Sequence, residues 1–443
     1  MGRDLTTLRQ LPRASTMRLT RLAASCSVVI VAALIATGCG GSADSASAGE
    51  VPVLGFMTWR DPTGLGDKLV ASCEKQAKGR YRIDQIPMGN NVDAAHEQVT
   101  RRLAAGDHTI DMLNLDTIWT AEFADAGWLV DLTDQVAPIK DTYLPSALVS
   151  TYYRGKYWAF PINANAAMLY YRKDLIKTPP KTWEELASQA AAVKAQHPGM
   201  IGFAFQGAPS ESGSVDAMEF LLGAGAKVLS EDGKTSVITD DSNAEHAFTF
   251  LQKMMHDGVA PRVVTTFTEN ESLQAFQGGN AVFMRNWPYA YTMMNADKAS
   301  KVKGKFAVAP LPAFEGHDPV AVLGGQNWAI ATTSQHPKLA LEAIQCLGGR
   351  DAQKQRALVK GEFSSLADLY QDPDVVKAYP FIPTLTTSLG MGQSRAVSPY
   401  YNDVSTVIYK AYNDVLQGNI SPAQATKRID HGVQLAIEGK AEI

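Results

Sequence analysis

The chain has 443 residues, of which 45% are hydrophobic and 19% charged, and its formal net charge is -4 at pH 7. A chain of this length is too long for one ordinary core, so two or more domains are expected, and the composition excludes a disordered protein. The slightly acidic balance gives no sign of a partner with a phosphate backbone, so no nucleic-acid partner is expected.

The first 38 residues have the features of an export signal. Arg18 and Arg21 precede the apolar run 22–37, which is shorter than the about 20 apolar residues of a membrane span. Small residues end the run in "ATGC", which is similar to a bacterial lipobox. This pattern predicts that residues 1–38 are removed and that Cys39 is lipidated. Cleavage of an ordinary secreted protein near the same place is the alternative.

Residues 39–50, "CGGSADSASAGE", are mostly small and polar and show no apolar period. Such a segment predicts a flexible tether between a lipid anchor and a folded body. A start at Met17 in place of Met1 would give a more compact signal. The expected location is therefore outside the cytoplasm, on the outer face of the cell membrane.

Two cysteines remain after the signal and the lipidated residue are set aside, namely Cys73 and Cys346. Exported compartments favour disulfides, so a Cys73–Cys346 bridge is the preferred interpretation. Two separate buried thiols are the alternative. A bridge would place an early helix beside a late one and make the fold discontinuous.

Strands and helices alternate along the rest of the chain. Thr182 and Glu185 have the spacing of a helix capping box. Strands are predicted at 51–59, 81–88, 110–115, 166–172, 201–207, 281–287, 305–313 and 327–333. Helices are predicted at 68–79, 93–107, 182–196, 216–226, 244–258, 336–349, 406–418 and 421–439. The pattern indicates an α/β fold. The absence of a long linker fits two lobes that share the chain by crossing back and forth.

Enzyme signatures are mostly absent from the sequence. There is no G-x-S-x-G elbow, no P-loop and no zinc motif, and the eight histidines are scattered singly, so no metal, cofactor or catalytic set is predicted. The acid pairs Asp240–Asp241 and Glu269 with Glu271 are interpreted as solvated turns. A glycosidase needs two carboxyl groups about 5–9.5 Å apart, for which Asp116 and Glu211 are the best pair available.

Aromatic, amide and acidic residues recur in turns where strands end. Ligands of open α/β sheets bind beyond the carboxyl ends of strands, and these side chains offer two-point hydrogen bonds and flat apolar faces. The pattern predicts a sugar site, although Asp116 also fits a catalytic acid or a helix cap, and Trp119 either faces the cleft or packs beneath it. The set comprises Trp59–Asp61, Asn90, Asn91, Asp116, Trp119, Asn163, Asn165, Asn286–Tyr289, Gly324–Asn327 and Tyr400–Asn402.

Several motifs together resemble the extracellular sugar-binding lipoproteins of ABC importers, the family 1 solute-binding proteins. They are the lipobox, the tether, "DTIWTAEFADAGWLVDLT" (116–133), "FPINANAAMLYYRKDL" (160–175), "FQGGNAVFMRNWPYAY" (276–291) and the segment 310–347. The resemblance covers essentially the whole mature chain. It is closest to the trehalose-binding lipoproteins of mycobacteria, whose two mature-chain cysteines fall in matching places.

The resemblance implies a two-lobed periplasmic-binding-protein-like fold, in which discontinuous lobes are joined by a hinge and close on a ligand. Lobe one would comprise 51–161 and 288–349, and lobe two 165–285 and 350–443. Family ligand contacts map onto Asp116, Asn165, Trp287, Gly325 and Arg395, and a further glutamate contact onto Glu211 in "GAPSESGS". The strand-end turns add Asn91, Gln326 and Tyr400 as candidate sugar contacts.

In these expected roles, Asp116 and Asn165 hydrogen-bond sugar hydroxyls, Trp287 stacks on a sugar ring, and Arg395 clamps hydroxyls. Arg395 is also expected to pair with Asp116 across the closed cleft. The resemblance implies a monomeric trehalose binder that delivers its sugar to permease subunits driven by a cytoplasmic ATPase. A maltose or malto-oligosaccharide binder is the first alternative. A secreted glycan hydrolase and a glycerophosphodiester or oligopeptide binder are further ones.

Overall fold

The computed structural model describes residues 51–89, 91–230, 233–240 and 242–441. The predicted signal, the tether, Cys39 and Asn90 lie outside these residues. Within the described part of the chain, no helix combines the length and the apolar character that a membrane crossing requires.

The larger of the two main sheets has six strands. Its order is β12-β11-β3-β1-β2, and β6 pairs with the other edge of β11. Strands β1, β2 and β3 are parallel, whereas β11 is antiparallel to β3 and β6. The strands are β1 (Val53–Thr58), β2 (Arg82–Pro87), β3 (Met112–Asp116), β6 (Phe160–Ala166), β11 (Ala321–Ile330) and β12 (Gly392–Ser394).

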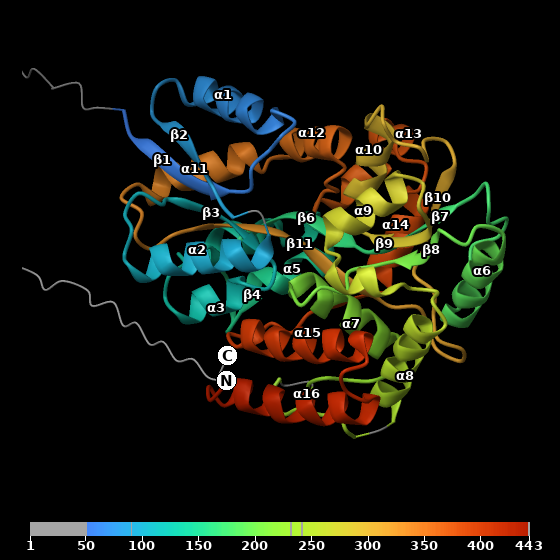
Figure 1. Ribbon diagram of the computed structural model, residues 1–443. Helices are drawn as coiled ribbons and strands as arrows, with labels where there is room; N and C mark the ends of the chain where they lie inside the picture. Colours follow the sequence, from blue (N-terminus) through green and yellow to red (C-terminus); the bar gives the residue numbers. More distant parts are fainter. Residues whose placement is uncertain (1–50, 90, 231–232, 241, 442–443) are drawn as a thin grey trace, which may run out of the picture. The chain divides into compact units, whose positions relative to one another are not determined.

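Helices cover both faces of this sheet (Figure 1). Successive side chains of a strand point to opposite faces, so Phe56 belongs to one core and Met57 to another. The first core includes side chains of α1 (Leu65–Ala77) and α11 (Pro337–Leu347), and the second includes side chains of α2 (Val92–Ala104) and α3 (Thr120–Asp125). Burial on both sides explains why β1 and β3 are nearly continuous apolar runs.

A disulfide joins Cys73 of α1 to Cys346 of α11, across a sequence separation of 273 residues. The two helices pack side by side over the same core. The bridge therefore ties an early segment of the chain to a late one.

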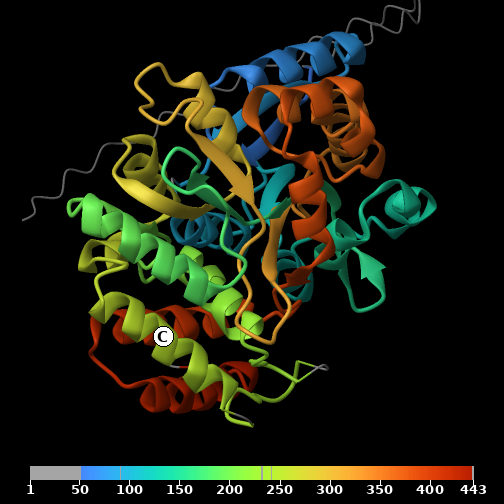
Figure 2. The same cartoon turned by 90° about the vertical axis from the view of Figure 1, so that its right-hand side faces the viewer.

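The smaller sheet has four strands in the order β10-β7-β9-β8. Helices α6 and α9 contact its strands, and the C-terminal helices α15 and α16, red in Figure 2, lie beside α7 and α8. The strands are β7 (Met168–Arg172), β8 (Ile201–Ala204), β9 (Ala281–Asn286) and β10 (Phe306–Ala309). The helices are α6 (Trp183–Gln196), α7 (Glu211–Gly223), α8 (Asn243–His256), α9 (Glu269–Gln277), α15 (Tyr401–Gln417) and α16 (Pro422–Ile437).

The chain passes from the larger sheet to the smaller one between β6 and β7, and returns between β10 and β11. This confirms the predicted α/β class with two bodies that share the chain, while the residue bounds of the two lobes stay a prediction. The remaining elements are short or peripheral: α4 (Thr133–Val136), η1 (Ala137–Thr142), α5 (Pro145–Leu148), η2 (Val149–Thr151), β4 (Tyr152–Tyr153), β5 (Lys156–Tyr157), η3 (Arg262–Thr266), α10 (Tyr289–Ala296), α12 (Arg350–Lys360), η4 (Ala367–Gln371), α13 (Pro373–Ala378) and α14 (Ile382–Gly390).

Several predicted element boundaries were wrong. The strand expected at 166–172 is β7, which begins at Met168, while β6 before it was not predicted. The strand expected at 327–333 begins at Ala321, since Gly324 and Gly325 have low strand propensity but are paired with β6. Helix α7 begins at Glu211 rather than at residue 216, although Ser and Gly residues fill its first turn.

Candidate ligand-binding site

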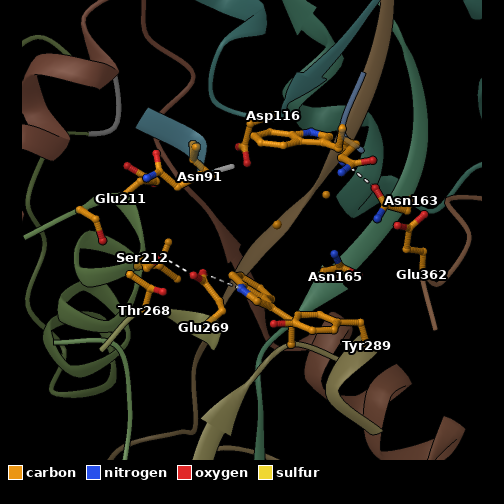
Figure 3. Close-up of a pocket in the computed structure, with 18 of the residues that line it drawn as sticks. Asn91, Asp116, Asn163, Asn165, Glu211, Ser212, Thr268, Glu269, Tyr289 and Glu362 are labelled. Atoms are coloured by element: carbon orange, nitrogen blue, oxygen red, sulfur yellow. Dashed lines mark hydrogen bonds between the residues drawn. The ribbon is translucent and has the colours of Figure 1, made fainter. Parts of the chain in front are cut away.

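A cavity of about 350 Å³ lies between elements of the two sheets (Figure 3). Ligand cavities of this size class are common, at roughly 300–1,000 Å³. Its wall is rich in polar groups, which include five carboxylates: Asp93, Asp116, Glu211, Glu269 and Glu362. Arg395 is the one cationic side chain among the described residues that line it.

Strand ends and strand register bring the predicted residues together. Asp116 is the last residue of β3, Trp287 follows β9, and Arg395 follows β12. In the larger sheet, Gln326 of β11 pairs with Asp116 on one side and with Asn163 on the other. The carboxyl ends of strands thus face one cavity, as expected for open α/β sheets.

Arg395 connects two of the predicted contacts. Its side chain is 4% exposed, and its Nη1 donates to Glu211 Oε1 at 2.6 Å. Its Nη2 donates to Asp116 Oδ1 at 3.2 Å and to Thr117 Oγ1 at 2.9 Å. Burial alone would lower the pKa of Arg395, but the charges of Asp116 and Glu211 outweigh burial and raise it. The guanidinium is therefore permanently charged.

Glu211, the first residue of α7, is buried against the C-terminal helix α15. Its Oε1 also accepts a hydrogen bond from the Tyr401 hydroxyl at 3.1 Å, and its Oε2 accepts one from Ser405. Burial raises the pKa of Glu211, and the charge of Arg395 opposes that rise. Three donors thus already occupy this carboxylate.

Among the described residues, Asp116 receives hydrogen bonds on only one of its two carboxylate oxygens. Oδ1 accepts from Arg395 and from the backbone N–H of Ile118 at 3.2 Å, which closes a local turn. Residue Trp119, not Asp116, is the N-cap of α3. No described residue donates to Oδ2 of Asp116, and the Asp116 residue lines the cavity. Trp119 itself is 1% exposed and packs beneath, against Phe123.

The Asn165 side chain has no hydrogen-bond partner among the described residues, and it lines the cavity. Across from it in the register lies Gly324, and Gly325 follows with φ of +148°. A Cβ on Gly325 would lie 2.4 Å from the Asn163 carbonyl oxygen, so only glycine fits there. Gln326 donates its backbone N–H to Asn163 Oδ1 at 2.6 Å and accepts from Asn114 at 3.3 Å.

Trp287 presents its indole to the same cavity. Its Nε1 donates to Glu269 Oε1 at 3.3 Å, while Ser212 donates to the other oxygen of Glu269 at 2.6 Å (Figure 3). A Cβ on Gly324 would lie 3.0 Å from the indole rim, so the glycine makes room for the ring. The ring is thus held at its nitrogen edge and at its opposite rim.

Of the two remaining predicted contacts, Asn91 lines the cavity and Tyr400 does not. Asn91 is also the N-cap of α2, and its Oδ1 accepts from the Ala94 N–H at 2.8 Å. Tyr400 does not line the cavity, and 39% of it is exposed. Its neighbour Tyr401 is the buried one that reaches Glu211, because the helix that starts there turns successive side chains by about 100°.

The model of the bacterial extracellular solute-binding protein family matches residues 82–354 of the chain. The chain is a bacterial extracellular solute-binding protein. Among curated proteins, it is 32% identical over 381 residues to the "Probable ABC transporter-binding protein" of Deinococcus radiodurans, covering 83% of this chain and 88% of that one.

Solved structures agree with this family assignment. The solute-binding protein matches maltose-bound T. maritima MalE3 with a TM-score of 0.81 and 32% identity, covering 86% of this chain and 99% of that one. It matches the GacH receptor of Streptomyces glaucescens with a TM-score of 0.78 and 20% identity, covering 87% and 98%, and that likeness shows the fold alone. The predicted two-lobed periplasmic-binding-protein-like fold is confirmed.

The sequence did not identify several residues that line the cavity of this solute-binding protein. Glu269 was interpreted as part of a solvated turn, yet it is the first residue of α9 and contacts Trp287. Asp93 lies in the first turn of α2, where burial raises its pKa, and its carboxylate accepts from the Glu211 N–H at 3.5 Å. The capping box of Thr268 and Glu271 was a usable signal for a helix start at Glu269.

Proposed function

We propose that this solute-binding protein captures a neutral sugar, trehalose in the first place, and delivers it to an ABC import permease. The observation that carries the proposal is a set of unused polar atoms beside an aromatic ring. Asp116 Oδ2 and the Asn165 amide face the cavity without partners among the described residues, and the Trp287 indole lines the same cavity. Sugars need acceptors and donors for hydroxyls and a flat apolar surface for a ring.

The charge of the cavity supports a neutral ligand over an anionic one. Five carboxylates line it against the single guanidinium of Arg395, which is already paired with Asp116 and Glu211. A phosphate group placed there would meet repulsion and find no free cation among the described lining residues. A glycerophosphodiester or a sugar phosphate is therefore expected to bind poorly.

Two glucose disaccharides are the candidate ligands. Trehalose is favoured by the resemblance of the mature chain, its two cysteines and Glu211 to the trehalose-binding lipoproteins. Maltose is the second candidate, because the T. maritima relative at 32% identity holds maltose. In both cases the sugar would bond to Asp116 and Asn165 and stack on Trp287.

Delivery follows from the family and from the predicted anchor. A lipid on Cys39 and the tether 39–50 would hold a monomer at the outer face of the membrane, near permease subunits driven by a cytoplasmic ATPase. The lobes would close on the sugar by a hinge motion. Arg395, which contacts Asp116 at the end of β3 and Glu211 at the start of α7, is placed to join the two sides in the closed form.

Hydrolysis of the sugar is not proposed. The carboxylate of Glu211, which a glycosidase would need as the partner of Asp116, accepts hydrogen bonds from Arg395, Tyr401 and Ser405. A carboxylate that is filled in this way is poorly placed to protonate a glycosidic oxygen or to activate water.

A thermal-shift screen tests the proposal. The purified protein is heated with trehalose, maltose, longer malto-oligosaccharides or glycerophosphocholine, since a ligand of the folded state raises the melting temperature. We expect trehalose to give the largest rise and glycerophosphocholine none. A rise with glycerophosphocholine alone, or release of glucose from either disaccharide, would overturn the proposal.

A further inference from the structure

A second buried arginine lies directly under the indole of Trp287. The guanidinium carbon of Arg285 lies 4.4 Å from the centroid of the Trp287 ring. Arg285 is 1% exposed and does not line the cavity, whereas Trp287 does. One face of the indole is therefore covered from the protein interior by a charged, planar group.

Fixed acceptors hold this guanidinium in place. Its Nε and Nη2 both donate to the carboxylate of Glu219, each at 2.8 Å, and its Nη1 donates to Gln206 Oε1 at 2.9 Å. Asp216 Oδ1 lies 2.9 Å from Nε. Burial alone would lower the pKa of Arg285, but Asp216 and Glu219 raise it. A bidentate ion pair, such as the one with Glu219, fixes the plane of the guanidinium as well as its position.

The Arg285–Glu219 pair also contacts β11 of the larger sheet. Glu219 Oε1 also accepts the backbone N–H of Val322 in β11 at 3.2 Å. Val322 lies two residues before Gly324, where an added Cβ would lie 3.0 Å from the rim of the indole. Through Glu219, Arg285 links the Trp287 ring of the smaller sheet to the cavity-lining strand of the larger sheet.

We propose that Arg285 is a positioning residue for ligand binding, which sets the plane of the Trp287 indole on which the sugar ring stacks. This inference rests on the proposed function, because it assumes that a ring of the ligand meets Trp287. Arg285 itself touches no ligand. Stacking depends on the angle between two flat surfaces, so a ring that is free to tilt binds more weakly.

A role limited to core stability is the competing explanation, and the chain offers a matched control. Arg356 is also buried, and its guanidinium carbon lies 4.6 Å from the ring centroid of Trp328. Trp328 does not line the ligand cavity. Replacement of each arginine by lysine keeps the positive charge but removes the planar guanidinium. Because Trp287 lines the cavity and Trp328 does not, only the replacement at Arg285 should alter ligand binding.

The test is a double-mutant cycle of Arg285→Lys and Trp287→Ala, with Arg356→Lys as the control, measured by calorimetric titration with trehalose and with maltose. We expect Arg285→Lys to weaken binding about tenfold and Arg356→Lys to leave it within about twofold. In the Trp287→Ala background, Arg285→Lys should cause no further loss, since its effect passes through the ring. An equal loss in both backgrounds, or wild-type affinity of Arg285→Lys, would overturn the inference.

Near-ultraviolet circular dichroism tests the same point without a ligand. The part of the indole signal that disappears in Trp287→Ala should also change in Arg285→Lys, and an unchanged signal would contradict the inference. This readout separates the inference from the proposed function, which fails if the wild-type protein binds no sugar. If Arg285→Lys does not fold, Glu219→Gln takes its place in the cycle, because it removes the charge that holds the guanidinium.

Discussion

At the scale of single residues, Asp116 divides its two carboxylate oxygens between the protein and the cavity. Oδ1 accepts from Arg395 and from the Ile118 N–H, and no described residue donates to Oδ2. A carboxylate held at one oxygen is fixed in orientation before a ligand arrives, so less conformational entropy is lost on binding. This arrangement favours the hydroxyl-clamp interpretation of Asp116 over the catalytic acid and the helix cap.

Replacement of Asp116 by alanine should weaken sugar binding ten- to a hundredfold, because a hydrogen bond to a charged group contributes about 1.5–3 kcal/mol. Calorimetric titration measures the loss. Asp134→Ala, on an exposed acidic residue in the first turn of α4, is the matched control and should bind as the wild type does. Equal affinity of the wild type and Asp116→Ala would remove Asp116 from the site.

At the scale of elements, β11 positions the site. Its antiparallel register with β3 and β6 places Asp116, Gln326 and Asn163 in one row. The register with β6 shifts between Gln326 and Asn327, next to the glycine pair. Bulges of this kind often lie beside functional sites, because they redirect side chains. Glycine within a strand often marks a place where a ligand or another backbone segment approaches closely.

Gly325→Ala should therefore disturb this strand and the cavity together. The substitution places a Cβ against the Asn163 carbonyl oxygen and forces a non-glycine residue to a φ of +148°. The expected cost is about 1–3 kcal/mol of unfolding free energy, along with weaker sugar binding. Thermal unfolding compares it with Gly199→Ala, whose Cβ would meet nothing within 4 Å. Equal melting temperatures of the two variants would show that Gly325 is not required.

The sequence predicted those site residues that follow strong local signals. Asp116, Trp287 and Arg395 stand at the ends of strands or in a family motif, and the structure brings all three to one cavity. Strand β6 and the first half of β11 were not predicted, because their asparagines and glycines have low strand propensity. In the structure, hydrogen bonds to neighbouring strands stabilise these segments as strands.

Tertiary arrangement explains the other misses. Glu269 and Asp93 belong to ordinary helix starts, whose sequence signals say nothing about the direction in which the first turn points. Tyr400 and Tyr401 are adjacent and chemically alike, and only the packing of α15 decides that Tyr401 faces Glu211. Residue types and local motifs therefore identify candidate site residues, and the packing of the elements determines which of them line the cavity.

At the scale of the whole molecule, the larger sheet contacts helix α7 through charged side chains. Arg395 bonds Asp116 at the end of β3 and Glu211 at the start of α7, and those elements pack in different cores. The disulfide lies elsewhere, between α1 and α11 on a face of the larger sheet. Closure of the cavity and stability of the larger sheet are therefore expected to depend on different contacts.

Removal of the disulfide should separate stability from binding. Cys73→Ser with Cys346→Ser frees a segment that the bridge closes over 273 residues, and loss of a native disulfide typically costs about 2–5 kcal/mol. The melting temperature should fall, while sugar affinity below that temperature should stay unchanged because neither cysteine lines the cavity. A loss of sugar affinity at temperatures where the variant is still folded would show that the bridge supports the site.

The most direct test of a neutral-sugar site is a calorimetric titration of the wild-type protein with trehalose and with trehalose 6-phosphate, followed by the same comparison for maltose and its phosphate. The two ligands of each pair differ by one anionic group, which the five carboxylates of the cavity should repel. We predict one-to-one binding of trehalose and at least tenfold weaker binding of its phosphate. Tighter binding of the phosphate, or no binding of either neutral disaccharide, would contradict the account.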